Sequence, residues 1–218
     1  MKNFDNSFLT GTIKFISGTD EVGRGPLAGP VVAASVVFSP DVYIEGVNDS
    51  KQLTEEEREE LAPIIIEKSL ACSVSAVTHF QIDKINILQA SLLAMSISVS
   101  RLKVKPHLIL VDGNKTFNSK IPTISIVKGD SQSFAIAAAS ILAKVARDRL
   151  MKRMCPRFPQ YLWSKNKGYA TKEHIEAIKV FGPSAFHRKT FLHKILNYEP
   201  EFEFVPKDSF VEMEPPSE

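Results

Sequence analysis

The sequence predicts an α/β fold with a helical C-terminal portion. Short apolar runs rich in β-branched residues alternate with longer segments of helical periodicity through most of the 218 residues. No internal repeat or linker-like stretch divides residues 1–198, so we expect a single domain there, with helical structure from about residue 150. Residues 199–218 are acidic and are expected to form a disordered tail.

The first strands are expected to form a hairpin. Residues 12–16 and 31–38 are apolar and β-branched, and the glycines and prolines between them favour a turn. This interpretation places Asp20 and Glu21 at the end of the first strand, just before the chain turns. A third strand is expected over residues 71–78.

A helix is expected between the second and third strands. Thr54 and Glu57 fit a capping box at its start, and the helix should continue to about Lys68. Pro63 is expected to kink it.

Two further helices are expected. Residues 86–101 have apolar side chains at helical spacing, which indicates core packing rather than a functional face. The longest helix should span residues 133–154. Its residues 135–139 are mostly alanine, so we expect it to pack closely against the sheet.

Adjacent carboxylates at Asp20 and Glu21 indicate a cation site. Each carboxylate makes ionisation of the other more costly, and a bound cation would remove that cost. Oxygen ligands with no nearby His or Cys favour Mg²⁺ or Mn²⁺ over zinc. The alternative is a solvated strand end followed by an ordinary turn.

Two more acids follow short buried strands expected over residues 107–111 and 123–127. These strands deliver Asp112 and Asp130 to the region where open α/β sheets gather functional groups. Four converging carboxylates could hold two divalent ions about 3.5–4 Å apart, as in phosphodiester cleavage, and a one-metal arrangement is also compatible. Taken singly, each Asp could instead cap a helix or form a turn.

Gly23, Gly25 and Gly29 do not form a nucleotide-binding loop. Their spacing is one residue too long for the dinucleotide fingerprint, and the chain has no P-loop motif.

The charge distribution favours nucleic acid as a partner. The net charge is only +2, but the last 20 residues hold seven acidic residues and one lysine, so the rest of the chain is basic. Basic residues concentrate between residues 144 and 194, where Tyr161, Trp163 and Tyr169 are interspersed with them. A solvated basic face is the alternative. The acidic tail could mask the basic surface or be inert.

The location expected from the sequence is the cytoplasm. No apolar run approaches the ~20 residues of a membrane span, and the N-terminus lacks the apolar core of a secretory signal. Cys72 and Cys155 have no CxxC spacing and are expected to be reduced thiols.

The motifs from Gly18 to Phe191 resemble those of bacterial ribonuclease HII, the type 2 ribonuclease H. In chain order they are DEVGRGPLAGP (20–30), DSK (49–51), VDG (111–113), KGD (128–130), AAASILAKVARD (137–148) and GYAT (168–171), with His174. The resemblance implies a ribonuclease H-like mixed sheet flanked by helices, with a helical C-terminal extension. It also implies a monomer that acts on RNA/DNA hybrids and on DNA containing ribonucleotides.

The resemblance also implies roles for individual residues. The metal-binding catalytic acids would be Asp20, Glu21, Asp112 and Asp130. Asp148 is the alternative for the fourth acid, although an ion pair with Lys144 one helical turn away is the simpler role for it. The substrate-binding residues would be Gly23, Arg24, Gly25, Lys51, Ser140, Lys144 and Tyr169. Weaker candidates are His174, His187 and Arg188.

These observations together predict a Mg²⁺- or Mn²⁺-dependent endoribonuclease. It would use metal-activated water to cut the RNA strand of hybrids and to incise 5′ of single ribonucleotides in duplex DNA, leaving 3′-hydroxyl and 5′-phosphate ends. A non-catalytic binder of hybrids and a metal phosphohydrolase for small nucleotides are the competing hypotheses. Four strand-end carboxylates would repel the phosphates that a pure binder must hold.

Overall fold

A computed structural model describes residues 1–196, except for the side chain of Lys194. Its centre is a mixed five-stranded sheet with the strand order β3-β2-β1-β4-β5. Strands β3, β2 and β1 pair antiparallel, whereas β1, β4 and β5 run parallel. The strands are β1 (Ile16–Val22), β2 (Val31–Val37), β3 (Ala71–Val77), β4 (Leu108–Asp112) and β5 (Thr123–Ile126).

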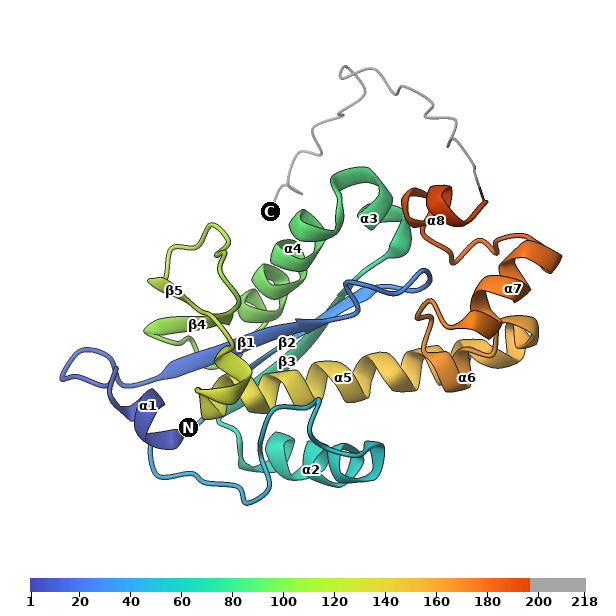
Figure 1. Ribbon diagram of the computed structural model, residues 1–218. Helices are drawn as coiled ribbons and strands as arrows, with labels where there is room; N and C mark the ends of the chain where they lie inside the picture. The colour runs from blue at the N-terminus through green and yellow to red at the C-terminus, as the bar shows by residue number, and fades with distance from the viewer. Residues whose placement is uncertain (197–218) are drawn as a thin grey trace, which may run out of the picture.

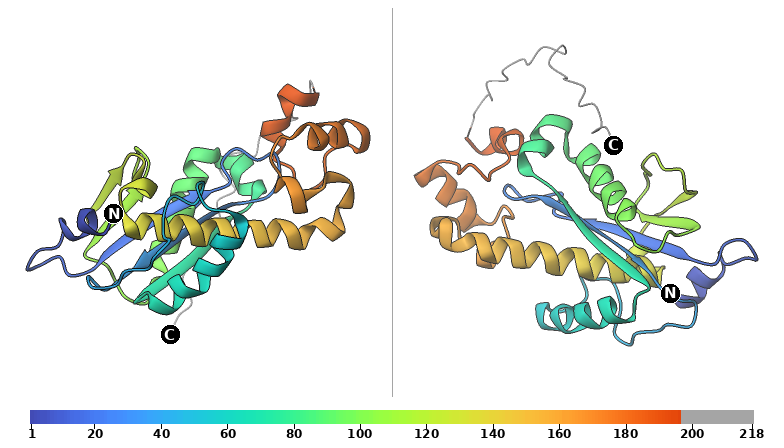
Figure 2. Two further views of the ribbon diagram at one scale, coloured as in Figure 1. Left: turned by 60° about the horizontal axis from the view of Figure 1, so that its bottom comes forward. Right: turned by 180° about the vertical axis from the view of Figure 1, so that it is seen from behind.

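Helices cover both faces of this sheet and gather beyond one end of it (Figures 1 and 2). The α-helices are α1 (Lys2–Asn6), α2 (Glu55–Lys68), α3 (His79–Ile85), α4 (Ile87–Ser100), α5 (Phe134–Met154), α6 (Trp163–Asn166), α7 (Lys172–Phe181) and α8 (Lys189–Leu196). Short 3₁₀ turns span Gly129–Ser131, Cys155–Arg157 and Pro159–Tyr161. The arrangement confirms the predicted fold class.

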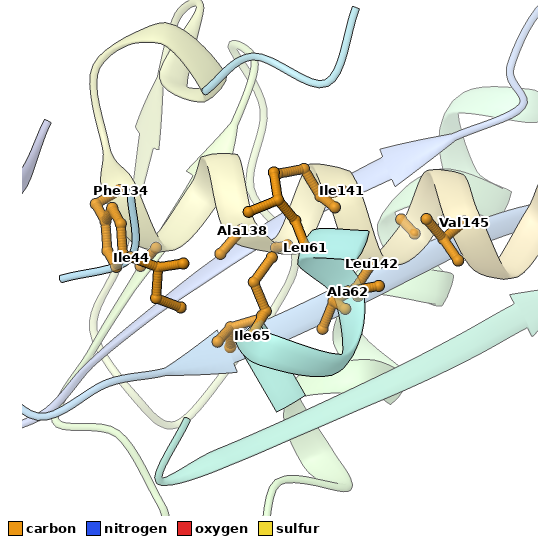
Figure 3. Packing of buried hydrophobic residues seen from close by; sticks show 14 of the residues in the cluster. Ile44, Leu61, Ala62, Ile65, Phe134, Ala138, Ile141, Leu142 and Val145 are labelled. Atoms are coloured by element: carbon orange, nitrogen blue, oxygen red, sulfur yellow. The ribbon is translucent and has the colours of Figure 1, made fainter. Parts of the chain in front are cut away.

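Strand β2 separates two hydrophobic layers because its side chains alternate between the two faces of the sheet. Ala34 and Val36 pack with α2 and α5, while Ala33 and Val37 pack with α4. Figure 3 shows the first layer, in which side chains of α2 and α5 interlock. All seven residues of β2 are buried, which accounts for its continuous apolar sequence.

Helix α5 lies directly against the central strands. Gly18 in β1 permits the approach, since a Cβ built there would lie 2.2 Å from the backbone of Ala135. The start of the helix is capped twice: the Ser133 side chain accepts from Ile136 N–H, and Asp5 Oδ2 accepts from Ala135 N–H at 2.9 Å. The small residues predicted to pack against the sheet are therefore at the contact.

Helix α2 has the predicted start and end, and the kink expected at Pro63 stays a prediction. It has the capping box formed by Thr54 and Glu57, and it continues through Pro63 to Lys68. Its packing partner is α5, through Leu61 and Ile65 among others.

The prediction of the first strand is wrong in its bounds. Residues 12–15 precede β1 because the Thr10 side chain accepts hydrogen bonds from the N–H groups of Thr12 and Ile13 and holds them in a turn. The strand instead runs from Ile16 to Val22, and Asp20 and Glu21 lie near its C-terminal end, as predicted.

The C-terminal helices form a separate hydrophobic cluster. It contains Leu27 and Ala28 from the β1–β2 turn, Met151 at the end of α5, and Trp163 and Ile178 from α6 and α7. The turn between β1 and β2 is therefore fixed by packing against the helical portion. Within residues 1–196, no helix is both long and apolar enough to cross a bilayer. The predicted acidic tail lies outside the described residues.

Candidate active site

Acidic side chains meet where β1 and β4 end. Thr19 pairs with Val111 in the parallel register, so Asp20 and Asp112 are the next residues of neighbouring strands. Glu21 follows Asp20. Asp130 comes from the 3₁₀ turn after β5, and this turn is tied to β4 because Gly129 N–H donates to Asp112 Oδ1 at 2.7 Å.

Burial and the nearness of other carboxylates disfavour the ionised forms of three of these acids. Burial raises the pKa of Asp20 well above its usual range, and the neighbouring Glu21 and Asp112 carboxylates raise it further. Burial raises the pKa of Glu21 to about 7, against the opposing effect of the Arg24 guanidinium. Burial and then Asp130 raise the pKa of Asp112. A cation among them would favour the ionised forms.

The residues present fit a hard divalent cation. The donors are carboxylate oxygens, which are the ligands that such a cation prefers. Within residues 1–196, no three acidic, His or Cys side chains already surround one point as a ligand set. Several carboxylates instead have an oxygen engaged by a protein donor: Asp20 by Glu21 N–H, Asp112 by Gly129 N–H, and Glu21 by Arg24.

A cavity of about 480 Å³ brings most of the candidate residues together. It is lined by Asp20, Glu21, Val22, Gly23, Arg24, Gly25, Ser50, Lys51, Arg58, Asp112, Ser140, Lys144 and Tyr169. All of the acids and substrate-binding residues named from the sequence lie there except Asp130. That residue is only 4% exposed and connects to the cavity through Lys51.

Lys51 links the loop before α2 to the acids. Its Nζ lies 2.8 Å from Asp130 Oδ2, and this hydrogen bond raises the pKa of Lys51. The side chain is nevertheless 78% exposed, so it can also face a bound anion. The loop is anchored to α5 by the hydrogen bond between the hydroxyls of Ser50 and Ser140.

Lys144 and Asp148 form the ion pair expected from their spacing. Lys144 Nζ lies 2.8 Å from the Asp148 carboxylate, and only Lys144 lines the cavity. Asp148 is 3% exposed. Asp130 is buried and paired with a cavity lysine in the same way, but the residue before it, Gly129, is also hydrogen-bonded to Asp112, whereas Asp148 holds Lys144.

The β1–β2 turn and Tyr169 form the other side of the cavity. A Cβ built on Gly25 would lie 4.0 Å from Tyr169 Cε1, so the turn backbone faces the aromatic ring. Tyr169 is 39% exposed. Arg24 Nη1 lies 3.3 Å from Glu21 Oε1, and the Arg24 side chain is 54% exposed.

His174 and His187 are buried and lie away from the cavity lining. Their Nε2 atoms are 3.1 Å apart, and His174 Nδ1 lies 2.8 Å from the carbonyl oxygen of Tyr169. These contacts indicate that His174, held by His187, fixes the backbone of Tyr169.

Tyr161 and Trp163 do not belong to the basic, aromatic nucleic-acid surface that the sequence suggested. They are 2% and 0% exposed, because they form the core of the C-terminal helices. Part of the basic surface is also neutralised, since Arg149 and Lys152 pair with Glu59 and Glu55 of α2. Of the three aromatic residues, Tyr169 alone remains available to a substrate.

Arg58 was missed by reasoning from the sequence. It lines the cavity from α2 and donates hydrogen bonds to the carbonyl oxygens of Ser50 and Leu53, which shapes the loop that carries Lys51. Arg58 lies in the first turn of α2, and this position does not reveal its role in the sequence. The carbonyl oxygens that accept its hydrogen bonds are placed by the path of the loop before the helix.

Comparison with known proteins identifies the family of this chain. A family model described as Ribonuclease HII matches residues 17–194. A protein of Caldanaerobacter subterraneus subsp. tengcongensis named Ribonuclease HII is 48% identical over 196 residues, covering 90% of this chain and 81% of that protein. A Rickettsia akari protein of the same name is 52% identical over 176 residues, which is 81% of this chain and 90% of the relative.

The fold is also similar to solved structures. The crystal structure of ribonuclease H2 from Pyrococcus horikoshii OT3 superposes with a TM-score of 0.69 at 28% identity, covering 84% of this chain and 97% of that chain.

Proposed function

Since this chain is a member of the ribonuclease HII family, whose enzymes are metal-dependent endoribonucleases that cut the RNA strand of RNA/DNA hybrids, we propose that it also incises duplex DNA 5′ of a single ribonucleotide. The products would be 3′-hydroxyl and 5′-phosphate ends. The observation that carries this proposal is the cavity that joins the acids of β1 and β4 to the glycine turn and Tyr169.

The proposed metal ligands are Asp20, Glu21, Asp112 and Asp130, with Mg²⁺ or Mn²⁺ as the ion. The bound ions would supply activation of a water molecule and stabilisation of the leaving 3′ oxygen. The carboxylates project from β1, from β4 and from the 3₁₀ turn after β5. No covalent enzyme intermediate is needed.

Phosphate binding is assigned to the cations on the cavity wall. Lys51 projects from an exposed loop, and Lys144 is fixed by Asp148. Ser140 lies one helical turn before Lys144 on α5, where its hydroxyl could donate to a phosphate oxygen in exchange for Ser50. These groups would offset the repulsion between substrate phosphates and the acids.

Recognition of the ribonucleotide is assigned to Gly23, Arg24, Gly25 and Tyr169. Glycines let the backbone approach a 2′-hydroxyl closely, and this hydroxyl is what distinguishes RNA from DNA. The ring of Tyr169 faces the turn and would stack on the sugar that follows.

The proposed partners are RNA/DNA hybrids and ribonucleotide-containing DNA, with the enzyme acting as a monomer in the cytoplasm.

The substitution Asp112→Asn tests the catalytic assignment. Asn keeps the oxygen that accepts Gly129 N–H, so the fold should be retained while a negative ligand is lost. We expect cleavage of a labelled RNA/DNA hybrid to fall by roughly 100-fold or more, since several kcal/mol of transition-state stabilisation are removed. Binding of the hybrid, measured by gel shift, should be largely unchanged.

The matched control is Asp41→Asn at an exposed position outside the cavity, which should cleave like wild type. Full activity of the Asp112 variant would remove this residue from the site. Binding of hybrid by the wild type without any cleavage would favour the binder hypothesis, and hydrolysis of free nucleotides alone would favour the phosphohydrolase.

A further inference from the structure

Two buried guanidinium groups lie directly behind the β1–β2 turn. Arg147 in α5 and Arg188 before α8 are both 0% exposed. Within the described part of the chain, neither has a carboxylate at ion-pair distance. Burying a charge without a counter-ion is costly, so their hydrogen bonds must compensate.

Both side chains donate to backbone carbonyl oxygens. Arg147 donates to Pro30 at 3.0 Å, Ala28 at 3.1 Å and Lys167 at 2.9 Å. Arg188 donates to three others in the same turn: Gly29 at 3.0 Å, Arg24 at 2.9 Å and Gly23 at 2.6 Å. Five carbonyl groups between residues 23 and 30 are thus held by two side chains. Hydrogen bonds from a charged donor are stronger than those between neutral groups.

These bonds determine where the N–H groups of the turn point. In a trans peptide the carbonyl of one residue and the N–H of the next point in opposite directions. Holding the carbonyls of Gly23 and Arg24 against Arg188 therefore turns the N–H groups of Arg24 and Gly25 away from it. Among residues 1–196 these two N–H groups have no acceptor, and both residues line the cavity.

Arg147 also contacts the opposite wall of the cavity. Its guanidinium carbon lies 5.7 Å from the centre of the Tyr169 ring, a cation–π distance. It occupies the space behind Gly23 as well, where a Cβ would lie 2.3 Å from Arg147 Nε, and Gly23 has a φ of +94°. One side chain therefore fixes both the turn and the ring between which the sugar would lie.

The two charges are close enough to affect each other. Burial, and then the nearby Arg147 charge, lower the pKa of Arg188 to about 9. This repulsion adds to the cost of burial, which the carbonyl contacts offset. The two guanidinium groups are therefore hydrogen-bonded positive charges that lie behind the backbone N–H groups of the turn.

We propose that Arg147 and Arg188 are positioning residues that set the preference for a ribonucleotide by orienting the Arg24 and Gly25 N–H groups and the Tyr169 ring. The inference rests on the proposed function of that turn. Neither guanidinium contacts the substrate. Their effect is on the geometry in which a 2′-hydroxyl is bound.

The test uses Arg147→Lys and Arg188→Lys, which keep the charge but leave one ammonium for three carbonyl acceptors. Arg149→Lys is the matched control, since Arg149 lies on the same helix with its side chain 57% exposed and paired with Glu59. For each full-length variant, kcat and KM are measured on a DNA duplex with one ribonucleotide. The inhibition constant of the same duplex without the ribonucleotide and the melting temperature are measured as well.

We expect KM for the ribonucleotide duplex to rise about 10-fold in the Arg147 and Arg188 variants, the equivalent of about 1.4 kcal/mol. The inhibition constant of the all-DNA duplex should stay within about twofold, because phosphate contacts are unaffected. The Arg149 variant should match wild type in both quantities.

The inference is overturned if KM and the inhibition constant change by the same factor or not at all. It is also overturned if both variants fail to fold, because the guanidinium groups would then be needed for the fold itself. If only one of the two variants folds, the comparison of KM with the inhibition constant in that variant decides the inference. Absence of incision by the wild type would instead reject the proposed function, and so the two failures are distinguishable.

Discussion

Acidification should weaken the C-terminal helical portion through His187. Its Nδ1 accepts from Ser184 N–H at 2.9 Å, so its proton is on Nε2 and points to His174 Nε2 at 3.1 Å. His174 Nε2 also accepts from Trp163 Nε1–H at 3.1 Å. Both rings are therefore neutral, and a second proton on either would face another N–H donor.

The magnitude follows from the pKa of His187. Burial, and then the nearby His174, lower this pKa from 6.5 to about 4. Between these two values the unfolded chain binds a proton that the folded chain does not, so stability is complete above pH 6.5 and is lost as the pH falls towards 4. Between pH 7.5 and pH 5 the loss is about 2 kcal/mol.

The assay is urea unfolding at pH 7.5 and pH 5 for wild type and His187→Asn. The Asn oxygen can replace Nδ1 as the acceptor for Ser184 N–H but does not titrate. Taking the difference between the two proteins cancels the contribution of other groups, and His193→Asn on the exposed surface of α8 serves as the control. The free energy of unfolding should fall by about 2 kcal/mol more in wild type than in His187→Asn. Equal pH dependence in the two proteins, within about 0.5 kcal/mol, would refute the reasoning.

Two further predictions concern the substrate wall and the core. Tyr169→Ala should lower kcat/KM at a single embedded ribonucleotide by about 10-fold or more, since aromatic stacking is worth about 1–3 kcal/mol, while the exposed Tyr43→Ala should stay within about twofold. Equal activity of the Tyr169 variant and wild type would remove the ring from substrate recognition. Gly18→Ala should lower the free energy of unfolding by about 1–3 kcal/mol in chemical denaturation, because its Cβ would meet the Ala135 backbone. Gly11→Ala has open space around it and should change stability by less than about 0.5 kcal/mol, so similar values for the two variants would contradict the close packing of β1 on α5.

Sequence patterns predicted most of the regular elements. The strand over residues 31–37 and the helix over residues 134–154 are local consequences of apolar runs, capping residues and small side chains. The error at β1 arose because its apolar run is interrupted by Gly18 and the polar Thr19. Both are buried by pairing with strands on either side, which a local pattern does not reveal. Helix α3 was also missed, although Thr78 provides its N-cap.

The acidic chemistry of the candidate site could be predicted from the sequence, but the buried contacts that shape the site could not. Acidic residues near strand ends indicated where Asp20 and Asp112 meet, because parallel strands end at the same edge of a sheet. The buried partners of the turn could not be predicted. Arg188 was only a weaker candidate from the sequence, and its contact with the turn could not be foreseen because its carbonyl acceptors at Gly23 and Gly29 lie more than 150 positions earlier.

Cleavage of a labelled DNA duplex with one embedded ribonucleotide tests the central proposal most directly. The reaction is run with Mg²⁺, with Mn²⁺ and with a chelator. We expect a single incision 5′ of the ribonucleotide with either metal, none with the chelator, and a product with a 3′-hydroxyl. Binding of this duplex without incision under every metal condition would contradict the assignment of the acidic cavity as a ribonucleotide-reading active site.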